Sequence, residues 1–176
     1  LPISISYSSS GLKVSDPAGL IGMGWSLKAE PLISRQAKGI ADDDGRGYLN
    51  NASLNTVTTL EYLHAFAKGD WDEDPDDFYF STLNRSGQFF FKRKSLTSPS
   101  LGYDIVNNPL SPVIINKISN GFSIKESDGT TYTYDKTETT QSPSYSYHSA
   151  WKISGISIAT TGKQINFNYN NTTSQE

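Results

Sequence analysis

Apolar residues occupy every second position along much of the second half of this chain. Between residues 78 and 169 these alternating segments are separated by turn sequences rich in Asn, Asp, Ser and Gly. Successive side chains of a β-strand point to opposite faces, so this spacing places one apolar face of each segment against a core. The pattern predicts an all-β fold of antiparallel hairpins, arranged as a sandwich or as a segment of an open barrel or shell.

The lengths of three turns predict which residues lie opposite each other. The predicted pairs are Phe80 with Phe91, Phe122 with Tyr134, and Ile158 with Ile165. The first pair follows from a four-residue turn, the second from a three-residue turn ending at Gly129, and the third from a two-residue turn at Thr161–Gly162. A bulge is expected at Gly155, because the alternation changes phase between Trp151 and Ile156.

One short helix is expected over residues 55–67. Leu60 and Leu63 fall on an apolar stripe at helical spacing, Thr56 or Asn55 is available as an N-cap, and Gly69 follows as a stop signal.

The 176 residues are enough for one core, and we expect a single β-rich domain over residues 1–170 with a frayed tail at 171–176. The chain starts on a strand pattern and resembles a fragment of a larger protein. Residues 95–112 contain three prolines, and residues 136–149 are almost entirely polar. Both stretches are expected to be irregular loops.

Composition argues against several classes of function. The net charge of -3 and the pI near 5.4 disfavour a nucleic-acid partner. The chain has no cysteine, so it can form neither a disulfide framework nor a thiolate metal site. It also has no apolar run long enough for direct membrane insertion. Its two histidines, His64 and His148, lack a neighbouring ligand set, and no Gly-x-Ser-x-Gly motif occurs. We therefore predict a protein that is not an enzyme and has no cofactor.

Two acidic loops are the strongest candidates for a metal site. Residues 42–45 read Asp-Asp-Asp-Gly, and residues 70–77 hold six carboxylates. Calcium binds about six to eight oxygens, and such loops can supply them. The candidate ligands are Asp42, Asp44, Asp72 and Asp74. Neither loop matches the spacing of an EF-hand, and the alternative is a solvated acidic surface.

Three tyrosines in predicted loops are candidate contacts to a glycan, because aromatic faces stack on sugar rings. They are Tyr103, Tyr145 and Tyr147. The alternative is that these side chains pack on the sheet, which is the more usual role of tyrosine in β-proteins.

Four motifs, each present once, follow one another along the chain. The first is Gly-Met-Gly-Trp-Ser-Leu at 22–27, followed by Ile-Ser-Arg at 33–35. The others are the acidic and aromatic segment DWDEDPDDFYFSTLNRSGQFFF, the hairpin DGTTYTYD and the closing WKISGISIATTGKQINFNY. Together they resemble the N-terminal region of bacterial Rhs/YD-repeat proteins, and are similar to the shell-forming components of insecticidal toxin complexes.

The resemblance assigns a structural role to thirteen residues. They are Gly22, Gly24, Trp25, Leu27, Arg35, Pro75, Asp76, Phe78, Phe80, Gly129, Tyr132, Trp151 and Gly162. Tandem YD repeats are absent, so the resemblance places this chain before the repeats. It implies a secreted or cell-surface module of a β-shell that encloses or displays a C-terminal effector, with the rest of the same polypeptide as its partner. The alternative function is a module that binds a surface carbohydrate or protein.

Overall fold

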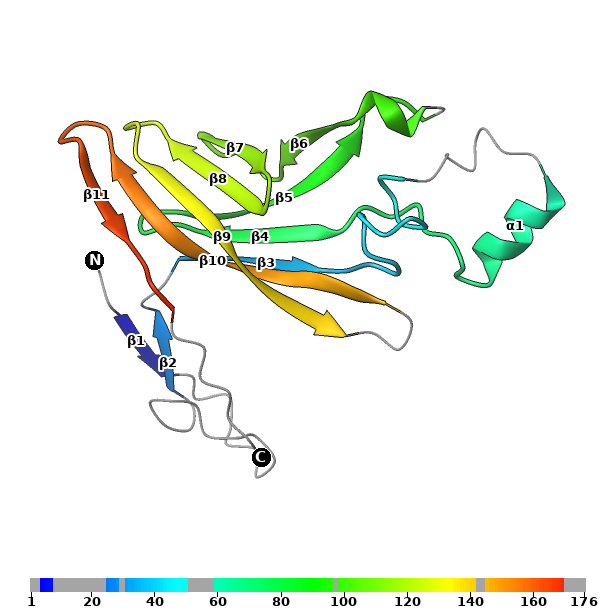
Figure 1. Cartoon of the computed structure of the whole chain (residues 1–176), viewed down its shortest axis with the longest axis horizontal. Coiled ribbons are helices and arrows are strands. Elements are labelled where there is room, and N and C mark those ends of the chain that lie inside the picture. The colour runs from blue at the N-terminus through cyan, green and yellow to red at the C-terminus, as the bar shows by residue number, and fades with distance from the viewer. Residues whose placement is uncertain are drawn as a thin grey trace.

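The fold is predominantly antiparallel β-sheet (Figure 1). The computed structural model describes residues 4–7, 25–28, 31–50, 59–96, 98–141 and 145–169. Its strands are β1 (Ser4–Tyr7), β2 (Trp25–Lys28), β3 (Leu32–Gln36), β4 (Asp77–Ser81), β5 (Ser86–Arg93), β6 (Tyr103–Asn107), β7 (Val113–Ile118), β8 (Gly121–Glu126), β9 (Thr131–Gln141), β10 (Ser146–Ile158) and β11 (Lys163–Asn166). The helical elements of the described residues are α1 (Leu60–Ala67) and the 3-10 helix η2 (Pro99–Leu101). The predicted all-β class is confirmed.

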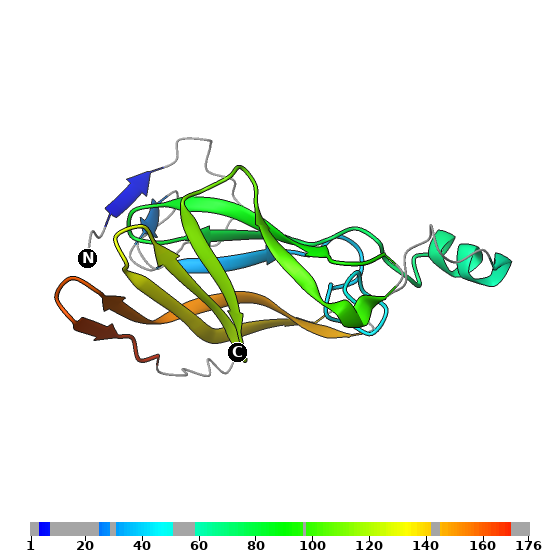
Figure 2. The ribbon, with the colours of Figure 1, turned by 90° about the horizontal axis from the view of Figure 1, so that it is seen from above.

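Most strands belong to one sheet with the order β6-β5-β4-β3-β10-β9-β8-β7. The long strand β10 pairs with β9 along one edge, and with β3 and then β11 along the other. β1 and β2 form a separate two-stranded sheet. Seen from above, the main sheet curls on itself into a nearly closed, barrel-like form (Figure 2).

Aromatic rings fill the inside of this curl. Phe122 on β8 is fully buried, and its ring centroid lies 5.7 Å from that of Phe78 on β4 and 5.3 Å from that of Phe89 on β5. The ring of Trp151, on β10, lies 5.0 Å from the ring of Phe122. Because β8 is far from β4 and β5 in the strand order, these contacts hold the two ends of the sheet together.

The β8–β9 hairpin has the register that the sequence predicts. Phe122 lies opposite Tyr134, and Gly129 has a φ of 84° in the left-handed region that suits glycine. The pairing of β10 with β9 is irregular between Ile153 and Gly155, so the expected bulge is also confirmed.

The predicted register of the β4–β5 hairpin is wrong. Phe80 lies opposite Gly87 rather than Phe91. Thr82 forms the turn earlier than predicted, because its backbone N donates to the carbonyl of Arg85 at 2.7 Å and its Oγ1 accepts from the backbone N of Arg85 at 3.0 Å. Ser86 and Gly87, expected in the turn, are therefore the first residues of β5.

The predicted register of the last hairpin is also wrong. Ile158 lies opposite Lys163 rather than Ile165, and Ile156 lies opposite Ile165. The connection is therefore four residues long, 159–162, instead of two. This register places Ile165 beside the buried Ile156, where it packs against the core.

Two segments expected to be irregular contain strands. β6 lies within residues 95–112 and pairs with β5, with Tyr103 and Ile105 packed against the core. β9 and β10 continue as a paired ribbon into residues 136–149. Threonine, which is abundant there, favours extended backbone, so a polar stretch can remain a strand outside the core.

Helix α1 is shorter than predicted. Thr59 has an extended backbone and is the N-cap, while residues 51–58 lie outside the described residues. Leu60 and Leu63 are 71% and 45% exposed, so these two residues of the apolar stripe are not buried in the core. Gly69 ends the helix with a φ of 76°, as predicted. Within the described residues, no helix has the length and apolar character needed to cross a membrane.

Candidate functional site

A buried ionic cluster lies where the loop after β3 meets the loop before β4. Antiparallel pairing of the two strands brings these loops together. Arg35 donates from Nε to Asp76 Oδ2 at 2.6 Å, and its Nη2 lies 2.6 Å from the same oxygen without the alignment of a hydrogen bond. Asp43 Oδ1 accepts from Arg35 Nη1 at 2.9 Å. The guanidinium is therefore paired with one carboxylate from each loop.

Asp76 also fixes the backbone of the neighbouring loop. Its carboxylate accepts from the backbone N of Lys38 at 2.8 Å and from that of Asp42 at 3.0 Å. In return, the backbone N of Asp76 donates to Asp42 Oδ1 at 3.1 Å. Both Asp42 and Asp76 are fully buried. Hydrogen bonds to a charged carboxylate are stronger than those between neutral groups, so Asp76 is the main link between the loops.

Asp72 makes a second link of the same kind. Its carboxylate accepts from the backbone N of Ile40 at 3.1 Å and from that of Asp74 at 3.0 Å. Gly39 passes close by with a φ of 75°, and a Cβ there would lie 2.8 Å from Asp72 Oδ2. Only glycine combines this backbone conformation with the short approach.

Burial favours the uncharged form of one carboxyl group in the cluster, that of Asp42. Removal from water and the nearby carboxylate of Asp76 raise the pKa of Asp42 to about 8. Burial also acts to raise the pKa of Asp43, but the guanidinium of Arg35 outweighs this effect and the pKa is lowered. At neutral pH Asp42 is therefore protonated beside the ion pair.

Asp42→Asn is expected to make stability less dependent on pH. Between pH 4 and about 8 the unfolded carboxyl has lost its proton but the folded one keeps it, so native stability falls as pH rises and then levels off. Asparagine cannot ionise, and its side-chain oxygen can still accept from the backbone N of Asp76. We expect the variant to gain about 1–3 kcal/mol over the parent by pH 8.

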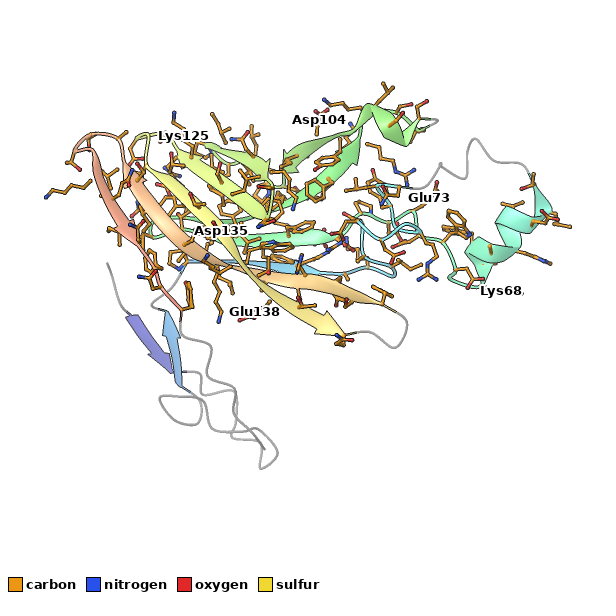
Figure 3. All side chains as sticks on the ribbon, in the orientation of Figure 1. Lys68, Glu73, Asp104, Lys125, Asp135 and Glu138 are labelled. Atoms are coloured by element: carbon orange, nitrogen blue, oxygen red, sulfur yellow. The ribbon has the colours of Figure 1, made fainter. Side chains whose placement is uncertain are left out.

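Urea unfolding at several pH values from 5 to 9 measures this difference. Asp104→Asn is the matched control, because Asp104 is 64% exposed and pairs with the exposed Lys94. Figure 3 shows Asp104 on β6, the edge strand of the sheet. If the free energy of unfolding depended on pH in the same way for the parent and for Asp42→Asn, the prediction would be wrong, and Asp42 would ionise as an exposed carboxyl does.

An open cleft of about 320 Å³ adjoins the ionic cluster. Phe122, Trp151 and Tyr103 contribute to its aromatic side, and Asp42 to its polar side. Lys117 from β7 also lines it, with Nζ 4.6 Å from the ring centroid of Phe122 and 5.6 Å from that of Trp151. Partial removal from water lowers the pKa of Lys117.

Three of the four candidate calcium ligands hold the loops through their carboxylates, and Asp74 takes part through its backbone N, which donates to Asp72. Asp42 and Asp72 are used as described above, and Asp44 Oδ1 accepts from the backbone N of Arg46 at 3.0 Å. In the part of the chain that the structure describes, no three His, Asp or Glu side chains are arranged to hold a metal ion. The calcium hypothesis therefore gains no support from the geometry.

The three candidate glycan contacts do not line one cleft. Tyr103 lies in the cleft beside the ionic cluster, with its ring 4.6 Å from that of Phe91. Tyr147 covers the guanidinium of Arg35 at 5.6 Å, and Tyr145 Oη donates to the carbonyl of Gly39 at 3.0 Å. Each side chain has a packing role in the fold.

The remaining motif residues divide into three groups. Phe78, Phe80, Tyr132 and Trp151 are buried in the core. Gly129 and Gly162 have positive φ angles in turns, and Pro75 lies in the loop directly before Asp76. Gly22 and Gly24 lie outside the described residues, and of Trp25 and Leu27 the structure describes only the backbone of β2.

Sequence reasoning missed two residues of the site, Asp43 and Lys117. Asp43 was part of an acidic run, and nothing in that run distinguished the residue that meets Arg35. Lys117 follows the buried Val113 and Ile115 at every second position of β7 and lies opposite Phe122, so the available signal was a charge in phase with apolar residues. Its approach to Trp151 on β10 depends on the curl of the sheet.

The fold and the site define a β-rich domain of barrel-like form whose loops are joined by a buried ionic cluster. Comparison with protein-family models, with curated proteins and with solved structures found no match.

Proposed function

We propose that this chain is a non-catalytic structural module of a large exported protein of the Rhs/YD-repeat type. In this role it forms part of a β-shell that encloses or displays a C-terminal effector. Its partner is the remainder of the same polypeptide, and its location is outside the cell or at the cell surface.

One observation carries the proposal. The residues that define two of the motifs, Arg35 of the Ile-Ser-Arg element and Asp76 of the acidic element, form one buried ion pair although 41 positions separate them. Phe78 and Phe80 of the same acidic element lie in the core. These motif residues thus have structural roles, which is what a shell module requires and what a catalytic or metal-binding motif would not need.

The coding sequence on either side of this chain tests the proposal. We expect a secretion signal or export domain upstream and tandem YD repeats downstream, ending in an unrelated effector domain. A flanking sequence that encodes a catalytic domain of another family, with no YD repeats, would contradict it.

A glycan array with the purified chain tests the alternative, a carbohydrate-binding module. The shell proposal predicts no specific binding. Binding that disappears in the variant Tyr145→Ala/Tyr147→Ala would replace it with the carbohydrate function, because these rings lie 5.8 Å apart and form the nearest pair of candidate contacts.

A further inference from the structure

Hydrogen-bonding groups without partners gather at the cleft beside the ionic cluster. Asp42 Oδ2 and Trp151 Nε1 are both buried and have no hydrogen-bond partner among the described residues. Both residues line the same cleft. Buried polar groups are nearly always paired with protein, water or a ligand, so two such groups at one cleft need an explanation.

The unpaired groups are donors. The indole Nε1 can only donate. Asp42 Oδ1 already accepts from the backbone N of Asp76, and the raised pKa of Asp42 keeps the carboxyl protonated at neutral pH, so Oδ2 carries an O–H. Lys117 adds an ammonium group that forms no ion pair within the described part of the chain. The carboxylate of Asp43, which also lines the cleft, attracts this ammonium group but is itself bound by Arg35. The missing partner is therefore rich in acceptor oxygens.

The rest of the cleft limits the size and shape of that partner. Its volume of about 320 Å³ is at the small end of the range for ligand sites. Leu49, Gly102 and Tyr103 are half-buried at its walls and offer apolar surface. A small acid with a flat apolar body satisfies both the donors and the walls.

We propose that the cleft between the ionic cluster and β7 binds a small carboxylate attached to an aromatic or other flat apolar group. The carboxylate accepts from Lys117 Nζ, Trp151 Nε1 and Asp42 Oδ2, and the apolar group lies against Tyr103 and Leu49. This site is separate from the shell function and does not depend on it.

The indole N–H signals in a two-dimensional ¹H–¹⁵N NMR spectrum report on this site directly. The chain has three tryptophans, and Trp151→Phe identifies the signal of Trp151 by its loss. Titration with phenylacetate is expected to shift that signal with a dissociation constant of about 1 mM, as befits a ligand with few atoms. Phenylacetamide, the neutral amide of the same shape, should give no comparable shift.

Two lysine variants complete the test. Lys117→Gln should weaken phenylacetate binding about tenfold or more, because it removes the ammonium group at the cleft. Lys125→Gln is the matched control and should bind as the parent does. Figure 3 shows Lys125 at the opposite end of the sheet from Glu73 of the acidic loop. Lys117 is exposed, so a well-dispersed spectrum of its variant is expected and shows that folding is retained.

Three results would overturn the proposal: no shift of the Trp151 signal up to about 50 mM phenylacetate, an equal shift with phenylacetamide, or unchanged affinity in Lys117→Gln. Any of these results would mean that the cleft is a water-filled gap and not a binding site for a carboxylate. A parallel titration with the peptide Gly-Gly-Phe, with a free or an amidated C-terminus, separates two sources of the same chemistry. If Gly-Gly-Phe with a free C-terminus binds more tightly than phenylacetate, the site recognises the C-terminal carboxylate of a peptide. If phenylacetate binds more tightly, the site recognises a small free acid.

Discussion

Asp76→Ala is expected to lower the free energy of unfolding by about 3–5 kcal/mol, because removal of one partner from a buried ion pair leaves the other charge without compensation. Among the described residues, Arg35 would keep one ion-pair partner, Asp43, whose side chain is 59% exposed. The backbone N–H groups of Lys38 and Asp42 would also lose their acceptor. The loss therefore combines an uncompensated charge with two unpaired backbone donors.

Urea unfolding followed by tryptophan fluorescence measures this loss. The neighbouring Asp77→Ala is the control, because Asp77 pairs at 2.8 Å with Lys38 at the edge of the solvent, where the two side chains are 17% and 43% exposed. A pair whose cation reaches water contributes about 1 kcal/mol, so the control should lose much less stability than Asp76→Ala. If the two variants unfolded at the same urea concentration, water would be shown to reach the cluster and the two loops to be held by other contacts.

The faces of the strands were predictable from the sequence, but the registers of two hairpins were not. The observed partner of each β4 residue on β5 lies four positions away from the predicted partner, and that of each β10 residue on β11 lies two positions away. An even difference keeps every side chain on its predicted face. Phe80 and Ile156 are therefore buried as expected although their partners differ. Local hydrogen bonds, such as those of Thr82, decide where the turn falls.

The ionic cluster left a weak signal in the sequence. Arg35 follows the fully buried Ile33 by two positions, and Asp76 precedes the buried Phe78 by two. Both charged residues are thus in phase with the apolar faces of their strands, where an isolated charge is costly. The pattern indicates that each needs a buried partner. It does not say which one, because that depends on how the distant loops meet.

The curl of the sheet was the least predictable feature. Alternation defines an apolar face but does not determine how far a sheet bends or which strands at its ends come together. The contact of Phe122 with Phe89 joins β8 to β5, strands that are not neighbours in the sheet. The cleft that holds Lys117 and Trp151 exists only because of this curl, so no local pattern could indicate it.

Phe122→Ala is therefore expected to destabilise the protein by about 3–5 kcal/mol, the usual cost of removing a fully buried aromatic side chain. Phe122 packs against Phe78 at 5.7 Å, Phe89 at 5.3 Å and Trp151 at 5.0 Å, so the cavity left behind would border three strands. Urea unfolding at pH 6 gives the free-energy difference.

Ile114→Ala is the matched control for this prediction. Ile114 lies on the adjacent strand β7 but is 61% exposed, so its loss should cost well under about 1 kcal/mol. A large difference between the two variants means that β8 packs its inner face on β4 and β5. If Phe122→Ala were as mild as Ile114→Ala, the sheet would have to be open in solution, and the cleft beside Lys117 would lose the wall that Phe122 provides.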